Sequence, residues 1–236
     1  MRYPLFDRLE LLKIGYAKGV SLSWLSQQNN FFAMNLRELI DQKLIPNTCE
    51  KYFDEGYSVW EQQVALNNKK IASERWNSEA MLCQLIYSLI RAKELKLVVE
   101  TGVANGISTG VALSALDHTG GVLHSFDVLA GCAELFPNAK NWHFHLLNLK
   151  KAPDELADTV KNIPETDLWI HDADHGTTWQ RMEFALATQK LKVGGLLISD
   201  DADASPAWGE MSKKLTHQSA ILLDRRKIIG ITPKLG

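Results

Sequence analysis

The chain has 236 residues, of which 45% are hydrophobic and 23% are charged, a composition typical of globular proteins. Its 26 basic and 28 acidic residues give a formal net charge of -2. This balance excludes a chain-wide positive electrostatic field that would attract nucleic acid or anionic lipid. We therefore expect a small-molecule partner, with no nucleic acid and no membrane. The length suits one large domain with a small addition.

The three cysteines, Cys49, Cys83 and Cys132, lie far apart and form no Cys-x-x-Cys pair. This spacing argues against a disulfide framework and against a zinc site. No stretch has the apolar character of a signal-peptide core or the length of a membrane span. We expect a cytoplasmic protein with reduced thiols, and the oligomeric state, a homo-oligomer included, stays open.

The first region, residues 1–75, carries helix-like patches at 6–18 and 34–43, which Pro46, Gly56 and polar runs interrupt. This pattern predicts a helical cap that shapes an acceptor pocket. The aromatic residues available to line such a pocket are Trp24, Phe31, Phe32, Tyr57 and Trp60.

Helices and short apolar runs alternate in residues 76–236. The polar stretch Asn77-Ser78-Glu79 is an N-cap candidate for an apolar helix over 81–90. Strands are expected at 97–101, 122–127, 142–147, 167–172 and 195–200, and the helices between and after them at 108–116, 133–136, 153–161, 178–191 and 208–215. Strands that alternate with helices indicate parallel βαβ units.

Two further apolar runs, 219–224 and 227–232, are joined by only two residues, which predicts a terminal antiparallel hairpin. The expected fold class is therefore α/β, a Rossmann-like, doubly wound, seven-stranded and mostly parallel sheet with a C-terminal antiparallel hairpin. The helical cap over residues 1–75 precedes this domain, which spans residues 76–236.

A glycine loop, Glu100-Thr-Gly102-Val-Ala-Asn-Gly106, follows the first strand of this domain. Small residues there let the backbone approach a ligand at the carboxyl end of the sheet. The loop lacks the Gly-x-Gly-x-x-Gly spacing of dinucleotide enzymes, which disfavours an NAD-dependent reductase. Asp127 ends the second strand, where a carboxylate can accept both hydroxyl hydrogens of an adenosine ribose.

Carboxylates gather after two neighbouring strands, in His171-Asp172-Ala-Asp174-His175 and in Ser199-Asp200-Asp201-Ala-Asp203. Like charges repel, and a hard cation such as Mg²⁺ relieves that repulsion, with Asp172, Asp200 and Asp201 as the expected ligands. The alternative is that these acids are solvated loop residues or helix caps. His175 lies three residues beyond Asp172, and its ordinary pKa of about 6.5 suits a general base. His171 is expected to face away and to pack.

Residues 76–236 resemble the class I S-adenosylmethionine-dependent methyltransferases. The resemblance rests on the acid and the Gly-x-x-x-Gly loop after the first strand, the acid after the second and the final hairpin. It implies S-adenosyl-L-methionine as the cofactor, whose methionine part passes Glu100, Gly102 and Gly106 and whose ribose is held by Asp127. At the start of the next helix, Ser108 and Thr109 are expected to reach the cofactor carboxylate. Asn148 is the candidate beside the adenine.

The pattern Asp172-x-x-His175 with Asp200-Asp201 resembles metal-dependent O-methyltransferases of sugar hydroxyls in macrolide pathways, and more distantly the catechol O-methyltransferases. Catechol enzymes usually have a lysine in place of His175 and an asparagine in place of Asp201, which disfavours a catechol. The resemblance implies Mg²⁺ or a similar ion at the three aspartates, with His175 as the catalytic base for a small-molecule or sugar hydroxyl. Two alternatives stay open: a metal-independent N- or O-methyltransferase, and a non-catalytic methyltransferase-like binding protein.

Overall fold

A computed structural model describes residues 31–33, 35–67, 71–213, 219–224 and 227–234, apart from the side chain of Phe31. The helix expected at 6–18 and Trp24 lie outside these residues. Within them, no helix has the length and apolar character needed to cross a membrane. The three cysteines are buried and unpaired.

One mixed sheet runs through the molecule, in the order β1-β7-β8-β6-β5-β2-β3-β4. Its strands are β1 (Phe31–Ala33), β2 (Leu97–Thr101), β3 (Val122–Asp127), β4 (Trp142–Leu146), β5 (Thr166–His171), β6 (Leu191–Ser199), β7 (Ala220–Asp224) and β8 (Lys227–Pro233). β8 runs antiparallel to β6 and to β7, and the other pairs are parallel. The expected α/β class and the terminal hairpin are confirmed.

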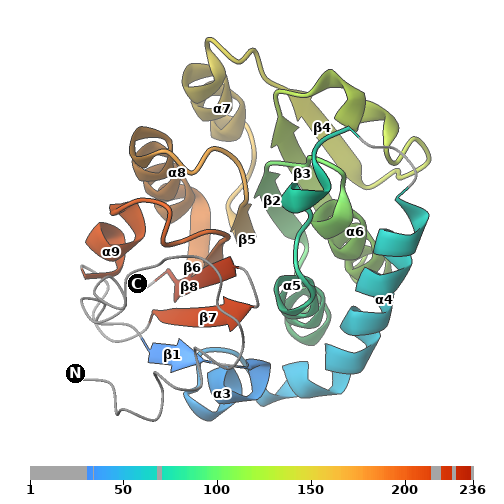
Figure 1. Ribbon diagram of the computed structural model, residues 1–236, viewed down its shortest axis with the longest axis vertical. Coiled ribbons are helices and arrows are strands. Elements are labelled where there is room, and N and C mark those ends of the chain that lie inside the picture. The colour runs from blue at the N-terminus through green and yellow to red at the C-terminus, as the bar shows by residue number, and fades with distance from the viewer. Residues whose placement is uncertain (1–30, 34, 68–70, 214–218, 225–226, 235–236) are drawn as a thin grey trace.

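Helices cover both faces of the sheet (Figure 1), with α4, α5 and α6 on one side and α7, α8 and α9 on the other. The helices are α3 (Leu36–Asp41), α4 (Phe53–Leu66), α5 (Ala80–Lys93), α6 (Ile107–Thr119), α7 (Ala152–Lys161), α8 (Thr177–Lys190) and α9 (Ala207–Ser212). Short 3-10 helices are η1 (Asn47–Tyr52), η2 (Glu74–Trp76) and η3 (Ala130–Glu134). This is the doubly wound arrangement that the alternation of strands and helices predicted.

The expected count of seven strands is corrected to eight within the described residues, because β1 pairs in parallel with β7. β1 comes from the region expected to be wholly helical. Its three residues are too few for an alternating pattern to reveal them. The same region adds Leu36, Leu39 and Cys49 to the core that α5 shares with the sheet. The boundary at residue 75 stays a prediction.

Gly56, expected to interrupt the first region, lies inside the continuous helix α4. A Cβ at this position would lie 3.1 Å from Tyr87 Cβ and 3.2 Å from Gln84 Cα, both on α5. Here the missing side chain lets two helices approach closely, and that packing outweighs the low helix propensity of glycine.

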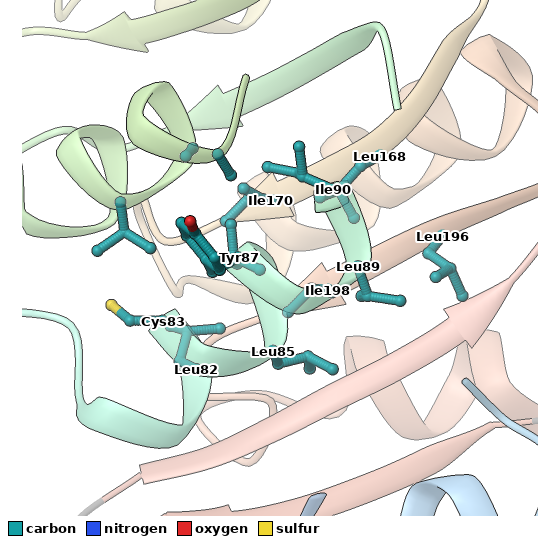
Figure 2. Packing of buried hydrophobic residues seen from close by; sticks show 14 of the residues in the cluster. Leu82, Cys83, Leu85, Tyr87, Leu89, Ile90, Leu168, Ile170, Leu196 and Ile198 are labelled. Atoms are coloured by element: carbon teal, nitrogen blue, oxygen red, sulfur yellow. The ribbon is translucent and has the colours of Figure 1, made fainter. Parts of the chain in front are cut away.

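The main core lies between α5 and the sheet. In Figure 2, Leu85, Leu89 and Ile90 of α5 pack over Ile170 of β5 and Ile198 of β6. The N-cap residue is Glu79, within the predicted Asn77-Ser78-Glu79 stretch, but its side chain makes no capping hydrogen bond. Instead Asp224 of β7 accepts hydrogen bonds from the backbone N–H groups of Met81 and Leu82. A carboxylate distant in sequence thus satisfies the free donors of the first turn.

The strand order reverses beside β2. From β2 the chain continues through β3 to β4 on one side and then returns to β5 on the other. Loops that leave adjacent strands at such a point diverge, and the crevice between them is where α/β sheets bind ligands. The fold therefore places the site at the carboxyl ends of β2 and β5.

Candidate active site

A cavity of about 670 Å³ opens at these strand ends. On one side it is lined by Gly102 and Asp127, after β2 and at the end of β3, and on the other by Asp172, His175 and Asp201, after β5 and β6. The sequence predicted these residues as two separate groups, and the structure brings them to one space.

Gly102 marks the closest approach between the two loops. Its φ is +84°, and a Cβ at this position would lie 2.0 Å from the backbone oxygen of Asp172. Only glycine fits such a contact in the left-handed region. Gly106 also has a positive φ, +79°, where it caps the start of α6, but it does not line the cavity.

Asp127 holds the glycine loop in place. Its Oδ2 accepts hydrogen bonds from the N–H groups of Val103 (2.7 Å) and Ala104 (3.0 Å), and its Oδ1 accepts one from Leu129 (2.8 Å). The residue is only 8% exposed, yet it lines the cavity. These three bonds use three of the roughly four acceptor positions of a carboxylate, so at most one is left for a ligand.

Glu100 is fully buried beneath the loop, and its carboxylate accepts hydrogen bonds from the hydroxyls of Ser108, Thr109 and Ser125. Burial raises the pKa of Glu100, and these hydrogen bonds oppose that shift. Because a buried carboxylate needs donors, Ser108 and Thr109 point at Glu100 and do not line the cavity. In this arrangement the three residues support the loop from behind.

Asn148 lies on the exposed connection to α7. Its Oδ1 accepts from the N–H of Lys150, and its own N–H donates to Glu155. The side chain thus shapes a turn and does not line the cavity, where Leu147 and Leu149 lie instead. A role for Asn148 beside the adenine stays a prediction.

Lys227, which the sequence analysis overlooked, lies among the predicted metal ligands. Its ammonium forms an ion pair with Asp200 and lies 3.9 Å from Asp172 Oδ1 and 3.8 Å from Asp201 Oδ2. Burial alone would lower the pKa of Lys227, but the three carboxylates raise it above its ordinary value. Burial, and next the charge of Asp200, raise the pKa of Asp172.

These residues do not fit a resident metal as they stand. Asp200 is fully buried, makes its ion pair with Lys227 and does not line the cavity. Within the described parts of the chain, no three His, Cys, Asp or Glu side chains are arranged to hold a metal ion. The predicted crowding of carboxylates is found, and a lysine ammonium lies within it.

His175 faces the same carboxylates. Its Nε2 lies 3.5 Å from Asp201 Oδ2 and 3.9 Å from Asp172 Oδ1. Burial, and next the neighbouring His171, lower the pKa of His175, and Asp201 partly opposes them. A histidine neutral at pH 7 can accept a proton, and the adjacent carboxylates would stabilise the resulting cation.

His171 is fully buried, as expected of a packing residue, and it also interacts with a carboxylate. Its Nδ1 lies 2.8 Å from Glu183 Oε2. Glu183 also accepts hydrogen bonds from Trp169, Trp179 and Thr101. Burial would raise the pKa of Glu183, but His171 and these donors hold it below its ordinary value. This network lies directly behind His175.

The mouth of the cavity is lined by Arg75, Trp76 and Trp179. Trp76 is 59% exposed. The aromatic residues expected in this role lie elsewhere: Phe32 and Trp60 pack against the core, and Tyr57 lies on α4 away from the cavity.

Comparisons with known proteins agree with the geometry. Residues 99–202 match the family model described as a methyltransferase domain. No curated protein matches the chain.

Several solved structures share the fold. The O-methyltransferase from Bacillus cereus in complex with SAH is 15% identical, with 84% of this chain and 96% of that chain covered and a TM-score of 0.51. Cofactor-bound Rv0187 from MTB is 16% identical, with 76% and 91% covered and a TM-score of 0.57. The MycE methyltransferase from the mycinamycin biosynthetic pathway, in complex with Mg and SAH, is 13% identical, with 75% and 55% covered and a TM-score of 0.53.

The doubly wound sheet and the cavity at its strand reversal define an α/β protein that binds its ligand at the carboxyl ends of the strands. The family match makes this class specific. Residues 99–202 carry the match to a methyltransferase domain, and the fold around them is that of the solved methyltransferases named above.

Proposed function

We propose that this enzyme transfers the methyl group of S-adenosylmethionine to a hydroxyl oxygen of a small molecule, sugars included. One observation carries the proposal: Gly102 and Asp127 line one side of the same cavity whose other side is lined by Asp172 and His175. A cofactor at the first side and an acceptor at the second would meet within one enclosed space. Holding two reactants together in this way supplies much of the rate acceleration in such transfers.

The cofactor half has polar and apolar parts that suit an adenosine. Asp127 would accept a ribose hydroxyl with its remaining acceptor position, and the methionine part would pass the backbone of Gly102, which lines the cavity. Val128, Leu147 and Leu149 line the same cavity and provide apolar surface for the adenine. Glu100, Ser108 and Thr109 would then act on the cofactor only through the loop that they support.

In the acceptor half, His175 Nε2 would take the hydroxyl proton. The acceptor oxygen forms a bond to the methyl carbon while the carbon–sulfur bond breaks, so S-adenosylhomocysteine and the methyl ether are the products. Asp201 Oδ2, 3.5 Å from Nε2, would stabilise the protonated imidazole. Trp76 and Trp179 offer aromatic surface to the body of the acceptor.

The names of structurally similar proteins favour an oxygen acceptor. The Bacillus cereus protein is an O-methyltransferase, and MycE binds Mg as well as SAH. A second candidate form of the function is therefore Mg²⁺-dependent transfer, with the ion at Asp172, Asp200 and Asp201. The observation in its favour is that three carboxylates converge on one point. It requires the Lys227 ammonium to leave that point.

Turnover with labelled cofactor tests the proposal. The purified chain is incubated with S-adenosylmethionine labelled at the methyl group and with a panel of sugars, phenols and amines. Calorimetry with S-adenosylhomocysteine reports cofactor binding separately. Label found in methyl ethers supports the proposal, and label found only in methylamines contradicts it. Cofactor binding without transfer to any acceptor would favour the non-catalytic alternative, and loss of turnover with EDTA, restored by Mg²⁺, would favour the second candidate form.

A further inference from the structure

Lys227 is the first residue of β8, and the sheet itself brings it to the site. β8 pairs antiparallel with β6, with Gly230 opposite Ser199. Past the end of β6, the N–H of Ala202 still donates to the oxygen of Ile228, offset by one residue from this register. The start of β8 therefore lies beside the turn that carries Asp200 and Asp201, and a side chain at position 227 must meet their carboxylates.

A lysine buried to this degree is stable only when its charge is compensated. Lys227 is 6% exposed, and its ammonium forms ion pairs with Asp172, Asp200 and Asp201. The ammonium therefore stays charged, and it fills the position toward which the aspartates converge. Asp200 is fully buried, and its ion pair with Lys227 compensates its charge.

Two of the three carboxylates lie at ion-pair distances from the ammonium, farther than a metal would be from its ligands. Mg²⁺ requires oxygen ligands at about 2.0 to 2.1 Å. The Lys227 Nζ lies 3.9 Å from Asp172 Oδ1 and 3.8 Å from Asp201 Oδ2. A divalent ion between these two oxygens would coincide with the ammonium and be repelled by it, so one position cannot hold both cations.

We propose that the Lys227 ammonium is the built-in cation of this site and replaces a divalent metal among the three aspartates. The assignment deepens the proposed function, on which it rests for the presence of an acceptor in the cavity. Lys227 lines the cavity, so its positive charge lies on the side where the acceptor oxygen becomes negative. A fixed charge aimed at that oxygen favours the transition state over the ground state. Lys227 would thus orient the acceptor and acidify it, while His175 takes the proton.

Binding of Mn²⁺ tests this assignment without any need for turnover. The wild-type chain, Lys227→Ala and the double variant Lys227→Ala/Asp201→Asn are titrated with Mn²⁺, and free Mn²⁺ is measured by electron paramagnetic resonance. We expect no site in the wild-type chain, one Mn²⁺ per chain in Lys227→Ala, and loss of that site in the double variant. Mn²⁺ should also raise the unfolding temperature of Lys227→Ala alone, because a ligand that binds only the folded state stabilises it.

Two results would overturn the assignment. One is a wild-type chain that binds Mn²⁺ in a manner that Asp201→Asn removes. The other is a Lys227→Ala protein that still binds S-adenosylhomocysteine, and is therefore folded, but takes up no Mn²⁺. If Lys227→Ala does not fold, Lys227→Met keeps the apolar stem and removes the charge, and the wild-type titration remains decisive. The proposed function fails separately, when no hydroxyl acceptor is methylated, whatever the Mn²⁺ titrations give.

Discussion

The imidazole of His171 stands perpendicular to that of His175, with ring centroids 5.4 Å apart and an interplanar angle of 89°. His171 is in turn held by Glu183, which is fully buried. The proposed base therefore rests against a ring that a buried carboxylate fixes in place.

This network predicts that Glu183→Gln destabilises the protein. A glutamine would direct its NH₂ group at some of the N–H donors that now face the carboxylate, those of Trp169 and Trp179 among them. An unsatisfied buried polar group costs about 1 to 3 kcal/mol, more when a charge was involved. Chemical denaturation measures the change. Glu210→Gln is the matched control, because Glu210 pairs with exposed Arg181 and its loss should change the unfolding free energy little.

Asp127→Ala is expected to weaken binding of S-adenosylhomocysteine. It removes the proposed ribose contact and also releases the N–H groups of Val103 and Ala104. Hydrogen bonds to a charged group contribute about 1.5 to 3 kcal/mol, or roughly 10- to 150-fold in affinity. Calorimetry compares this variant with Asp158→Ala, which removes an exposed carboxylate on α7. An unchanged affinity in folded Asp127→Ala would rule out the ribose assignment.

His175→Ala should slow methyl transfer by roughly 10²- to 10⁴-fold, the usual contribution of a general base. The affinity for S-adenosylhomocysteine should not change, because His175 lies on the acceptor side of the cavity. Single-turnover rates and calorimetry measure the two quantities. A fully active variant would mean that another group accepts the proton, and only the role of His175 would then have to be withdrawn.

Gly102→Ala is expected to disrupt the site. The new Cβ would lie 2.0 Å from the backbone oxygen of Asp172, at a φ of +84°. Gly194→Ala separates the two effects, because Gly194 has a similar φ of +79° with open space around it. The unfolding free energy of the control should fall by only about 1 to 2 kcal/mol, the cost of a left-handed backbone conformation for a residue with a side chain. Denaturation curves that show equal losses for the two variants would contradict a tight contact at Gly102.

Three stacked histidines on β3 and β4 predict a loss of stability in acid. Burial, and next the charges of His143 and His145, lower the pKa of His124 to about 4. The unfolded chain binds a proton near pH 6.5 and the folded chain only near pH 4, so stability should fall as the pH falls through this range.

Replacing His124 by Phe keeps a stacked ring and removes the titrating group. The difference in unfolding free energy between wild type and variant should therefore change between pH 6.5 and pH 4 and stay constant above that window. His118→Phe, at an exposed position on α6, is the control. A wild-type chain with the same pH profile as His124→Phe would contradict the lowered pKa.

Much of the fold was predictable because the strands are local patterns. The runs at 97–101 and 122–127 coincide with β2 and β3, since buried parallel strands are continuous apolar segments bounded by polar residues. β1 was missed because three residues carry no period. Gly56 was misread because its role depends on a neighbouring helix, which a single chain segment does not reveal.

The site was predictable where its residues directly follow strands. It was not predictable where the interacting residues are distant in sequence. Asp127, Asp172 and His175 were predicted from their positions at strand ends, and all three line the cavity. Lys227 was not, although antiparallel pairing of the last strand with β6 places position 227 beside the carboxylates. The network around Glu183 was likewise hidden, because its donors come from three separate elements.

Asn105 connects the glycine loop to the segment that forms the mouth of the cavity. Its Oδ1 accepts from the N–H groups of Ile71 and Ala72, and its Nδ2 donates to the oxygen of Ala72. Trp76, at the mouth, belongs to the same segment. An acceptor that shifts this segment would therefore also shift the loop beside the cofactor. Linkage then requires each ligand to change the affinity of the other by the same factor, and the Asn105 amide would carry part of that cooperativity.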